Sequence, residues 1–160
     1  MKRALLLVAA LAVTHTGCLT EEVDTSGLTS VDGYESWFRL DLAGDLPGHG
    51  RSYRIIYVND IAQSYPHVGR YPVGTTVVKE VRALEHRDGV PVPGEINYTA
   101  VMRKVTLDDD GDAGTGLPLD AGWLFTQLTD TPGTEDQLDL CWASCHRQGG
   151  WDGAFLDYGQ

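Results

Sequence analysis

The sequence predicts a single domain of the α+β class, made mainly of β-strands with a few short helices and a helix near its C-terminus that carries two cysteines. Segments rich in β-branched and aromatic residues recur along the middle of the chain and are typical of strands. Helical spacing of apolar residues is confined to two short stretches, one early and one late. The chain shows no internal repeat, and its 160 residues are enough for one hydrophobic core.

Four segments are predicted as strands because β-branched and aromatic residues dominate them. They comprise residues 51–58, 75–84, 95–107 and 122–129. The first contains an unbroken apolar run from Ile55 to Val58, which predicts a buried strand. Asn59 or Asp60 can then cap a brief helix that begins at Ile61.

An aromatic pattern near the N-terminus predicts a short helix. Tyr34, Trp37 and Phe38 stand at positions i, i+3 and i+4, so a helix here would present one aromatic face. Residues 43–50, which contain three glycines and a proline, are expected to form a loop.

Residues 108–122 are expected to form a long acidic loop. Asp108, Asp110 and Asp112 alternate there in a way that faintly resembles a calcium-binding loop. The glycine and the distal bidentate glutamate of such a loop are missing at the required offsets. A solvated connection between two strands is therefore the favoured interpretation, and a metal site is the alternative.

The N-terminus has the build of a secretory signal. Lys2 and Arg3 precede ten apolar residues, a run that is too short to span a bilayer. The small pair Thr16-Gly17 directly before Cys18 is typical of a lipoprotein cleavage site. We therefore expect residues 1–17 to be a lipoprotein-type signal peptide and Cys18 to be lipidated. The alternative is ordinary secretion with Cys18 free or in a disulfide.

Removal of the signal leaves a small acidic domain. The polar residues 18–31 are predicted to be a flexible tether, and residues 32–160 form the domain. The mature chain keeps ten basic and 23 acidic residues, a net charge of −13. Because no basic patch remains, nucleic acid is excluded as a partner, and membrane contact is expected through the lipid anchor only.

One strand carries a lysine on its apolar side. Side chains alternate between the two faces of a strand, so Lys79 shares a face with Val77 and Val81. Burial of an ammonium group is costly unless the group is paired or chemically changed. From the pattern alone, the favoured interpretation is a lysine near the edge of the sheet whose ammonium group reaches water, and a buried lysine is the alternative.

The stretch "TEDQLDLCWASCH" predicts a helix that presents two sulfur atoms on one face. Thr134 and Gln137 have the spacing of a capping box, and two glycines after the stretch can end the helix. The residues with helical spacing are Leu138, Cys141, Trp142 and Cys145.

Three chemistries suit two cysteines followed at once by a histidine. A zinc site would need a fourth ligand from another histidine, and none has a paired spacing. A disulfide between Cys141 and Cys145 is geometrically marginal on a helix and leaves His146 without a role. Covalent haem uses all three residues, because the thiols add to the two vinyl groups and the imidazole binds the iron as the proximal ligand. Haem is the favoured interpretation.

No residue stands out as a second axial ligand for that iron. After processing, the remaining methionine is Met102, in the middle of a predicted strand. His49, His67 and His86 lie in loop-like or strand-end contexts. An open distal position, able to bind a small molecule, is therefore expected.

Taken in order, these pieces resemble the cytochrome P-460 family, which includes the cytochrome c′-beta proteins. The resemblance covers about residues 32–158. The matching pieces are Trp37, "YRIIYVND" with Arg54, "YPVGTTVVKE" with Lys79, "VMRK" with Met102, "GWLF" with Trp123, "CWASCH", and an aromatic tail after Asp152.

The resemblance implies a periplasmic, mainly antiparallel β protein, commonly dimeric, with one c-type haem near its C-terminus. Cys141 and Cys145 would form the thioether bonds and His146 would bind the iron. The family's usual motif has two residues between the cysteines, whereas this chain has three. Lys79 matches a lysine that is joined covalently to the haem edge in cytochrome P-460 proper, which would explain a lysine on an apolar face. Arg54 matches an arginine on the distal side.

Three functions follow as hypotheses. The first is oxidation of hydroxylamine or a related small nitrogen species, with Lys79 and Arg54 as catalytic residues. The second is capture of nitric oxide without turnover, as in c′-beta proteins. The third is a haem-free lipoprotein with a Cys141–Cys145 disulfide. A redox-partner cytochrome and a second copy of the chain are the expected protein partners.

Overall fold

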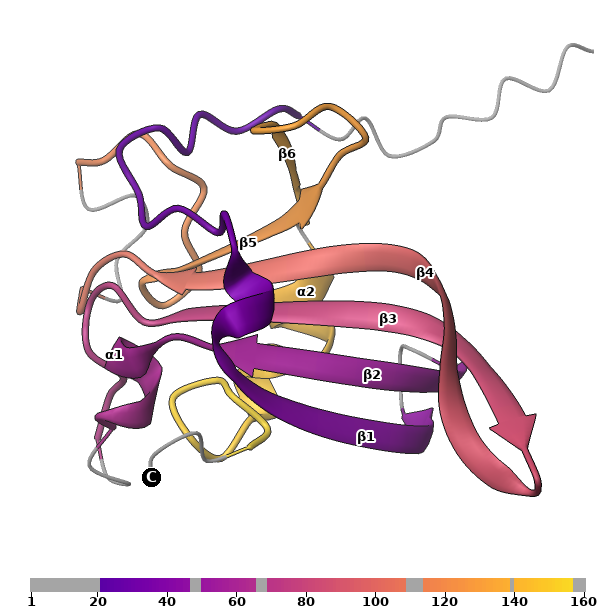
Figure 1. Ribbon diagram of the computed structural model, residues 1–160. Helices are drawn as coiled ribbons and strands as arrows, with labels where there is room; N and C mark the ends of the chain where they lie inside the picture. The colour runs from indigo at the N-terminus through magenta and orange to yellow at the C-terminus, as the bar shows by residue number, and fades with distance from the viewer. Residues whose placement is uncertain (1–20, 47–49, 66–68, 109–113, 139, 157–160) are drawn as a thin grey trace, which may run out of the picture.

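The computed structural model describes residues 21–46, 50–65, 69–108, 114–138 and 140–156, and its main feature is one six-stranded antiparallel sheet. Each strand pairs with the next along the chain, so the sheet is a simple meander (Figure 1). The strands are β1 (Phe38–Leu46), β2 (Gly50–Val58), β3 (Thr76–Arg87), β4 (Val90–Lys104), β5 (Trp123–Leu128) and β6 (Glu135–Gln137).

Short helices flank the sheet. They are η1 (Tyr34–Ser36), α1 (Asp60–Gln63), α2 (Leu140–Ser144) and η2 (His146–Gln148). In the part of the chain that the structure describes, no helix has the length and apolar character needed to cross a membrane.

The strand register divides the side chains of the sheet between two faces. Ile56 lies opposite Lys79, and Lys79 lies opposite Ala100, so these residues share one face. We call this the site face; its other members include Phe38, Leu40, Arg54, Val58, Val77, Met102, Trp123 and Phe125. The opposite face includes Ile55, Tyr57, Val78, Glu80, Val101 and Arg103.

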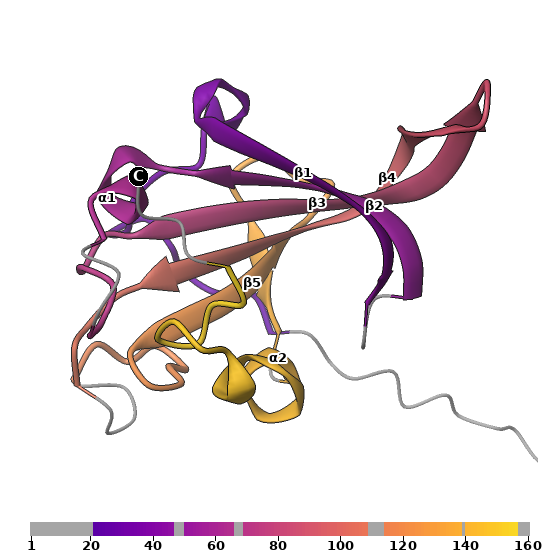
Figure 2. The same cartoon turned by 90° about the horizontal axis from the view of Figure 1, so that it is seen from below.

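Each face carries its own hydrophobic layer. Leu138, Cys141 and Trp142 pack against the buried residues of the site face. On the opposite face, Tyr34 and Trp37 pack against a second buried cluster. Figure 2 shows the sheet between α2 on one side and the turn that contains η1 on the other.

The four predicted strands are confirmed as β2 to β5, and the mainly antiparallel β class is confirmed with them. Asn59 caps α1, because its side-chain oxygen accepts a hydrogen bond from the Ala62 N–H at 3.0 Å. Lys79 lies on the apolar side of β3, as its position in the alternation predicts.

Two local predictions near the N-terminus are wrong. The aromatic segment forms only the single turn η1, and Phe38 begins β1 instead of ending a helix. The expected loop at 43–50 is also largely strand, since β1 runs to Leu46 and β2 begins at Gly50. Alternating Phe38, Leu40 and Leu42 pack on the site face, and this period of two outweighs the helical spacing of the aromatic residues.

The predicted capping box is wrong as well. Residues 135–137 form β6, which pairs with β5, and the helix begins only at Leu140. A buried ion pair between Glu135 and Arg103 favours the strand, because it ties this segment to the sheet.

The segment predicted to be a tether lies against the sheet in its described part. Val23 is buried with Leu119 and Leu124, and its N–H donates to the Glu135 carbonyl at 2.9 Å. From Glu21 onward the predicted tether therefore contributes to the packing of the domain. The predicted signal peptide, Cys18, Asp110 and Asp112 lie outside the described residues.

Candidate functional site

A cavity lies between the site face and the C-terminal segment. Its volume is about 40 Å³, which is room for a few water molecules. Its wall is formed by Ile56, Val77, Lys79, Ala100, Val101, Met102, Phe125, Leu138, Cys141 and His146. Three of the residues that the sequence singles out, Lys79, Cys141 and His146, therefore meet at one mostly apolar cavity.

Lys79 reaches this cavity from the middle of β3. Burial lowers the pKa of its ammonium group, and nearby Arg54 acts in the same direction. The thiols of Cys141 and Cys145 are close enough to oppose that shift electrostatically. A lysine in this setting loses its proton more readily than one in water, so its nitrogen is a better nucleophile.

His146 is held by a backbone contact beyond its own helix. Its Nδ1 lies 2.8 Å from the Gly153 carbonyl oxygen, and because a carbonyl only accepts, Nδ1 is the protonated nitrogen of this pair. Phe125 and Phe155 flank the imidazole at ring-centroid distances of 4.9 and 5.3 Å. Burial lowers the pKa of His146, so the ring is neutral and Nε2 keeps its lone pair.

The two cysteines stand one helical turn apart. Cys141 lies in α2, and the Cys145 N–H donates to the Cys141 carbonyl at 3.2 Å. Both thiols are free, and burial raises the pKa of Cys141 while Lys79 partly offsets the rise. The extra residue between the cysteines therefore leaves the thiols and His146 on one compact segment.

Arg54 lies on the site face beside this cavity but outside its lining. Its side chain is 3% exposed, and Nη2 donates a long hydrogen bond of 3.4 Å to the Gly44 carbonyl. Among the described residues, neither Nε nor Nη1 has a hydrogen-bond partner. A buried guanidinium with unused donors is suited to an anionic or strongly polar group, and burial lowers its pKa accordingly.

Comparison with known proteins decides the family. The family model described as Cytochrome P460 matches residues 31–151, about three quarters of the chain. The chain belongs to the cytochrome P460 family. It is therefore a haem cytochrome, as the resemblance of its motifs predicted. A search of curated proteins found no significant match.

The residues at the cavity fit the haem of a P460 cytochrome in their chemistry. A neutral imidazole with Nδ1 engaged offers Nε2 to an iron, and two free thiols on the adjoining turn suit the vinyl groups. The cavity walls are apolar, as a macrocycle requires.

Other candidate ligands are placed less favourably. His86 is exposed near the end of β3, and His49 and His67 lie outside the described residues. Met102, the methionine of the matching piece "VMRK", lines the cavity. No group of three or more His, Cys, Asp or Glu residues within the described ranges is arranged to hold a metal ion.

Two further residues near the cavity escape sequence reasoning. Tyr98 lies on the site face opposite Val81, where burial raises its pKa and both Cys141 and Arg54 are near enough to affect it. Phe125 lies in β5 and packs against His146. The strand register would have placed both on the site face once Lys79 was assigned to it.

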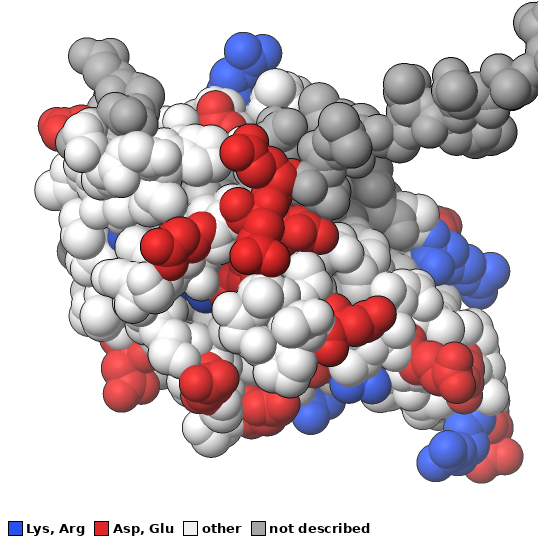
Figure 3. Space-filling model, turned by 90° about the horizontal axis from the view of Figure 1, so that it is seen from above, with Lys and Arg blue, Asp and Glu red and all other residues white. Residues whose placement is uncertain are grey.

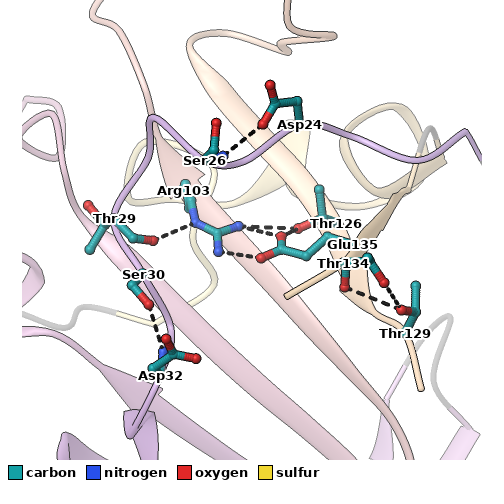
Figure 4. Close-up of polar contacts among 10 residues, drawn as sticks. All are labelled: Asp24, Ser26, Thr29, Ser30, Asp32, Arg103, Thr126, Thr129, Thr134 and Glu135. Carbon is teal, nitrogen blue, oxygen red and sulfur yellow. Dashed lines mark hydrogen bonds and ion pairs between the residues drawn. The ribbon is translucent and has the colours of Figure 1, made fainter. Parts of the chain in front are cut away.

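The charged groups of the opposite face point away from this site. Glu80 follows Lys79 in sequence but accepts hydrogen bonds from Tyr34 and Arg82, both at 2.7 Å, on the other side of the sheet. Figure 4 shows Arg103 on that face between Glu135, Thr126 and the Thr29 carbonyl. These groups belong to the scaffold.

Proposed function

We propose that the protein is an exported cytochrome that carries one covalent c-type haem and oxidises hydroxylamine or a related small nitrogen species. The observation that carries this proposal is the meeting of Lys79, Cys141 and His146 at one apolar cavity. The three residues come from a central strand, a helix and the turn after it, and a purely structural core has no need for this combination. Family membership supplies the haem.

The C-terminal residues hold the cofactor in this proposal. Cys141 and Cys145 form the thioether bonds, and His146 gives its Nε2 lone pair to the iron while Nδ1 stays bonded to Gly153. When bound, the haem supplies a coordination site for the nitrogen compound and takes up its electrons.

Lys79 and Arg54 act on the other parts of the site. Burial favours the neutral amine of Lys79, which is the nucleophilic form of this side chain. Arg54 offers two buried donor nitrogens that have no partner among the described residues, so it can orient a polar ligand or stabilise negative charge that develops on it.

Capture of nitric oxide is the second candidate, and the apolar cavity wall favours it. Ile56, Val77 and Phe125 present hydrocarbon to any small ligand, which suits an uncharged diatomic molecule. This function requires no bond between Lys79 and haem, so the state of Lys79 separates the two candidates.

Export and anchoring at Cys18 complete the proposal, with the domain in the periplasm or at the cell envelope. Acidic side chains gather on the surface formed by the N-terminal segment and β6 (Figure 3). Exposed acidic residues of this region include Glu21, Glu22, Asp24 and Asp130. Such a surface favours a basic redox partner that accepts the electrons, and transfer to it should weaken as salt rises. A homodimer is proposed from family resemblance.

The test begins with protein made in cells that mature c-type cytochromes. The intact mass and visible spectrum of the denatured protein show whether haem is covalently bound, and peptide mapping shows which side chains carry it. Reduction of an electron-accepting dye with hydroxylamine then measures turnover. The Cys141→Ser variant serves as the control for attachment, and Cys18→Ser tests anchoring by release of the domain from the membrane fraction.

Each outcome selects one function. Haem on the peptides of Cys141, Cys145 and Lys79, with hydroxylamine turnover, supports the enzyme. Haem on the cysteine peptide alone, without turnover, supports nitric oxide capture. A wild-type mass without haem overturns both and favours a haem-free module.

A further inference from the structure

We propose that a buried ion pair between Lys104 and Asp152 positions His146 as the proximal ligand, through the turn that carries the Gly153 carbonyl. The inference rests on the proposed role of His146. It assigns a function to two charged residues that neither directly contact the imidazole nor line the cavity.

The first link is the burial of Lys104 at the end of β4. The lysine is 1% exposed, and its Nζ lies 2.9 Å from Asp152 Oδ2 and donates to the Ala121 carbonyl at 2.9 Å. Nζ also lies 5.0 Å from the ring centroid of Trp123. A cation so deeply buried is strongly tied to its carboxylate, because separation would leave both charges without water.

The second link is the backbone at Asp152. This residue has a φ of 46°, in the left-handed region that few residues other than glycine adopt. Its carboxylate accepts from the Tyr71 N–H at 2.9 Å, and its carbonyl accepts from the Trp123 indole N–H at 2.7 Å. With Lys104, three contacts from the sheet side hold Asp152 in this conformation.

The third link joins Asp152 to the histidine. Gly153 follows with a φ of 85°, and its carbonyl accepts from His146 Nδ1 at 2.8 Å. A Cβ at this glycine would lie 2.5 Å from the Trp142 ring, so the turn and α2 are in close contact. The direction of the Gly153 carbonyl is therefore set by the ion pair one residue earlier.

The consequence for the site is control of the imidazole. A ligand histidine that donates its second N–H to a fixed acceptor is held in one tautomer and one orientation, and it becomes a more basic ligand. Loss of the Lys104–Asp152 pair should loosen the carbonyl, weaken the Nδ1 hydrogen bond and make His146 a weaker donor to iron.

The neighbouring residue provides a matched control. Arg103 is also buried, at 3% exposure, and is paired with a carboxylate, but it points to the opposite face and has no path to His146. We compare Lys104→Met with Arg103→Met in haem-loaded protein. The readouts are the iron–histidine stretching frequency of the ferrous form and the reduction potential.

The expected result is a lower stretching frequency and a higher potential in Lys104→Met alone. Hydroxylamine turnover should also fall, by about tenfold or more. Trp123→Phe removes the indole donor to Asp152 and part of the ring beside Lys104 but keeps the ion pair, and should shift both readouts in the same direction by less. This variant keeps the test decisive if Lys104→Met does not fold. Equal shifts in the Lys104 and Arg103 variants, or unchanged readouts in Lys104→Met and Trp123→Phe, would overturn the inference.

A haem-free measurement separates this inference from the proposed function. Nitrogen-15 NMR of the imidazole should show the Nδ1–H tautomer of His146 in the wild-type and Arg103→Met proteins, and a mixture of tautomers in Lys104→Met. A wild-type protein that never binds haem but shows this pattern would refute only the haem proposal. A tautomer that does not respond to Lys104→Met would refute the positioning role.

Discussion

The two faces of the sheet bury charged groups in different ways. On the opposite face, Arg103 donates two hydrogen bonds of 2.6 Å to Glu135, and the two side chains are 3% and 4% exposed. On the site face, Arg54 is buried to the same extent, yet its Nε and Nη1 have no partner among the described residues. Lys79 is held there in a setting that lowers its pKa.

This difference suggests that buried charged groups on the two faces of the same sheet have different roles, one in stability and the other in function. Buried polar groups in proteins are nearly always satisfied, so unsatisfied ones mark places where another group is expected. The opposite face satisfies its charged groups internally and supports the fold. On the site face, Lys104 is likewise paired, with Asp152, but Arg54 keeps two donor nitrogens without a partner among the described residues, at a cost in stability that binding of a ligand can offset.

The strongest test of the comparison between the two faces is to replace one arginine on each face. Arg103→Met leaves the Glu135 carboxylate buried without its partner, and we expect a loss of about 3–5 kcal/mol in the free energy of unfolding. Arg54→Met removes a cation that lacks full pairing, and we expect a change near zero or a gain in stability. Urea unfolding of both variants measures the difference.

The two variants should show the opposite order of effects on hydroxylamine turnover. Arg54→Met should lower hydroxylamine turnover by about 10²–10³-fold if its N–H groups stabilise developing charge. Arg103→Met should retain turnover at temperatures where it is folded. Equal destabilisation by the two substitutions would show that both faces belong to the scaffold.

Much of this arrangement could be predicted from alternation alone. Lys79, Val77 and Val81 share a face by their positions in β3, and the contrast between Lys79 and Glu80 follows from the same rule. The "CWASCH" stretch gave the cysteines and His146 in one segment. Both inferences depend on local sequence, which is why they were accessible.

The features that could not be predicted from the sequence depend mainly on long-range contacts. β6 exists because Glu135 pairs with Arg103 across the sheet, and no pattern within residues 134–137 indicates that partner. The bond from His146 to Gly153 and the pair between Lys104 and Asp152 likewise join segments that only the fold brings together. The hairpin between β3 and β4 was a missed local signal, since Asp88-Gly89, with φ values of 53° and 80°, is a strong turn dipeptide.

Burial of Lys79 makes the stability of the haem-free protein depend on pH. The unfolded chain keeps the lysine proton up to a pKa near 10.5, whereas burial lowers the pKa of Lys79 in the folded state. Between these two values the unfolded state binds more protons, so the free energy of unfolding rises with pH, by at most about 1.4 kcal/mol per pH unit. Above 10.5 the contribution is constant.

Lys79→Met isolates this contribution because it leaves every other titrating group in place. The variant should be more stable than the wild type at pH 7, and the gap should narrow as the pH approaches 10. Urea unfolding at several pH values measures it. If the difference in free energy of unfolding between Lys79→Met and the wild type is independent of pH, Lys79 keeps its ordinary pKa in the folded state. The contrast with the opposite face would then rest on Arg54 alone.

The smallest expected effect tests whether the opposite face is independent of the site. The Tyr34 hydroxyl donates to Glu80 at 2.7 Å, and burial together with Glu80 raises the pKa of Tyr34, so it remains a donor at any physiological pH. Tyr34→Phe should cost about 1–2 kcal/mol, since Glu80 keeps Arg82 as a partner. Tyr53→Phe is the control, because its hydroxyl reaches Asp41 at 3.1 Å on an exposed surface and should contribute almost nothing.

Neither substitution should change the haem spectrum or turnover. A spectral change in Tyr34→Phe would mean that β3 couples Glu80 to Lys79 through the backbone, and the two faces would then act as one unit.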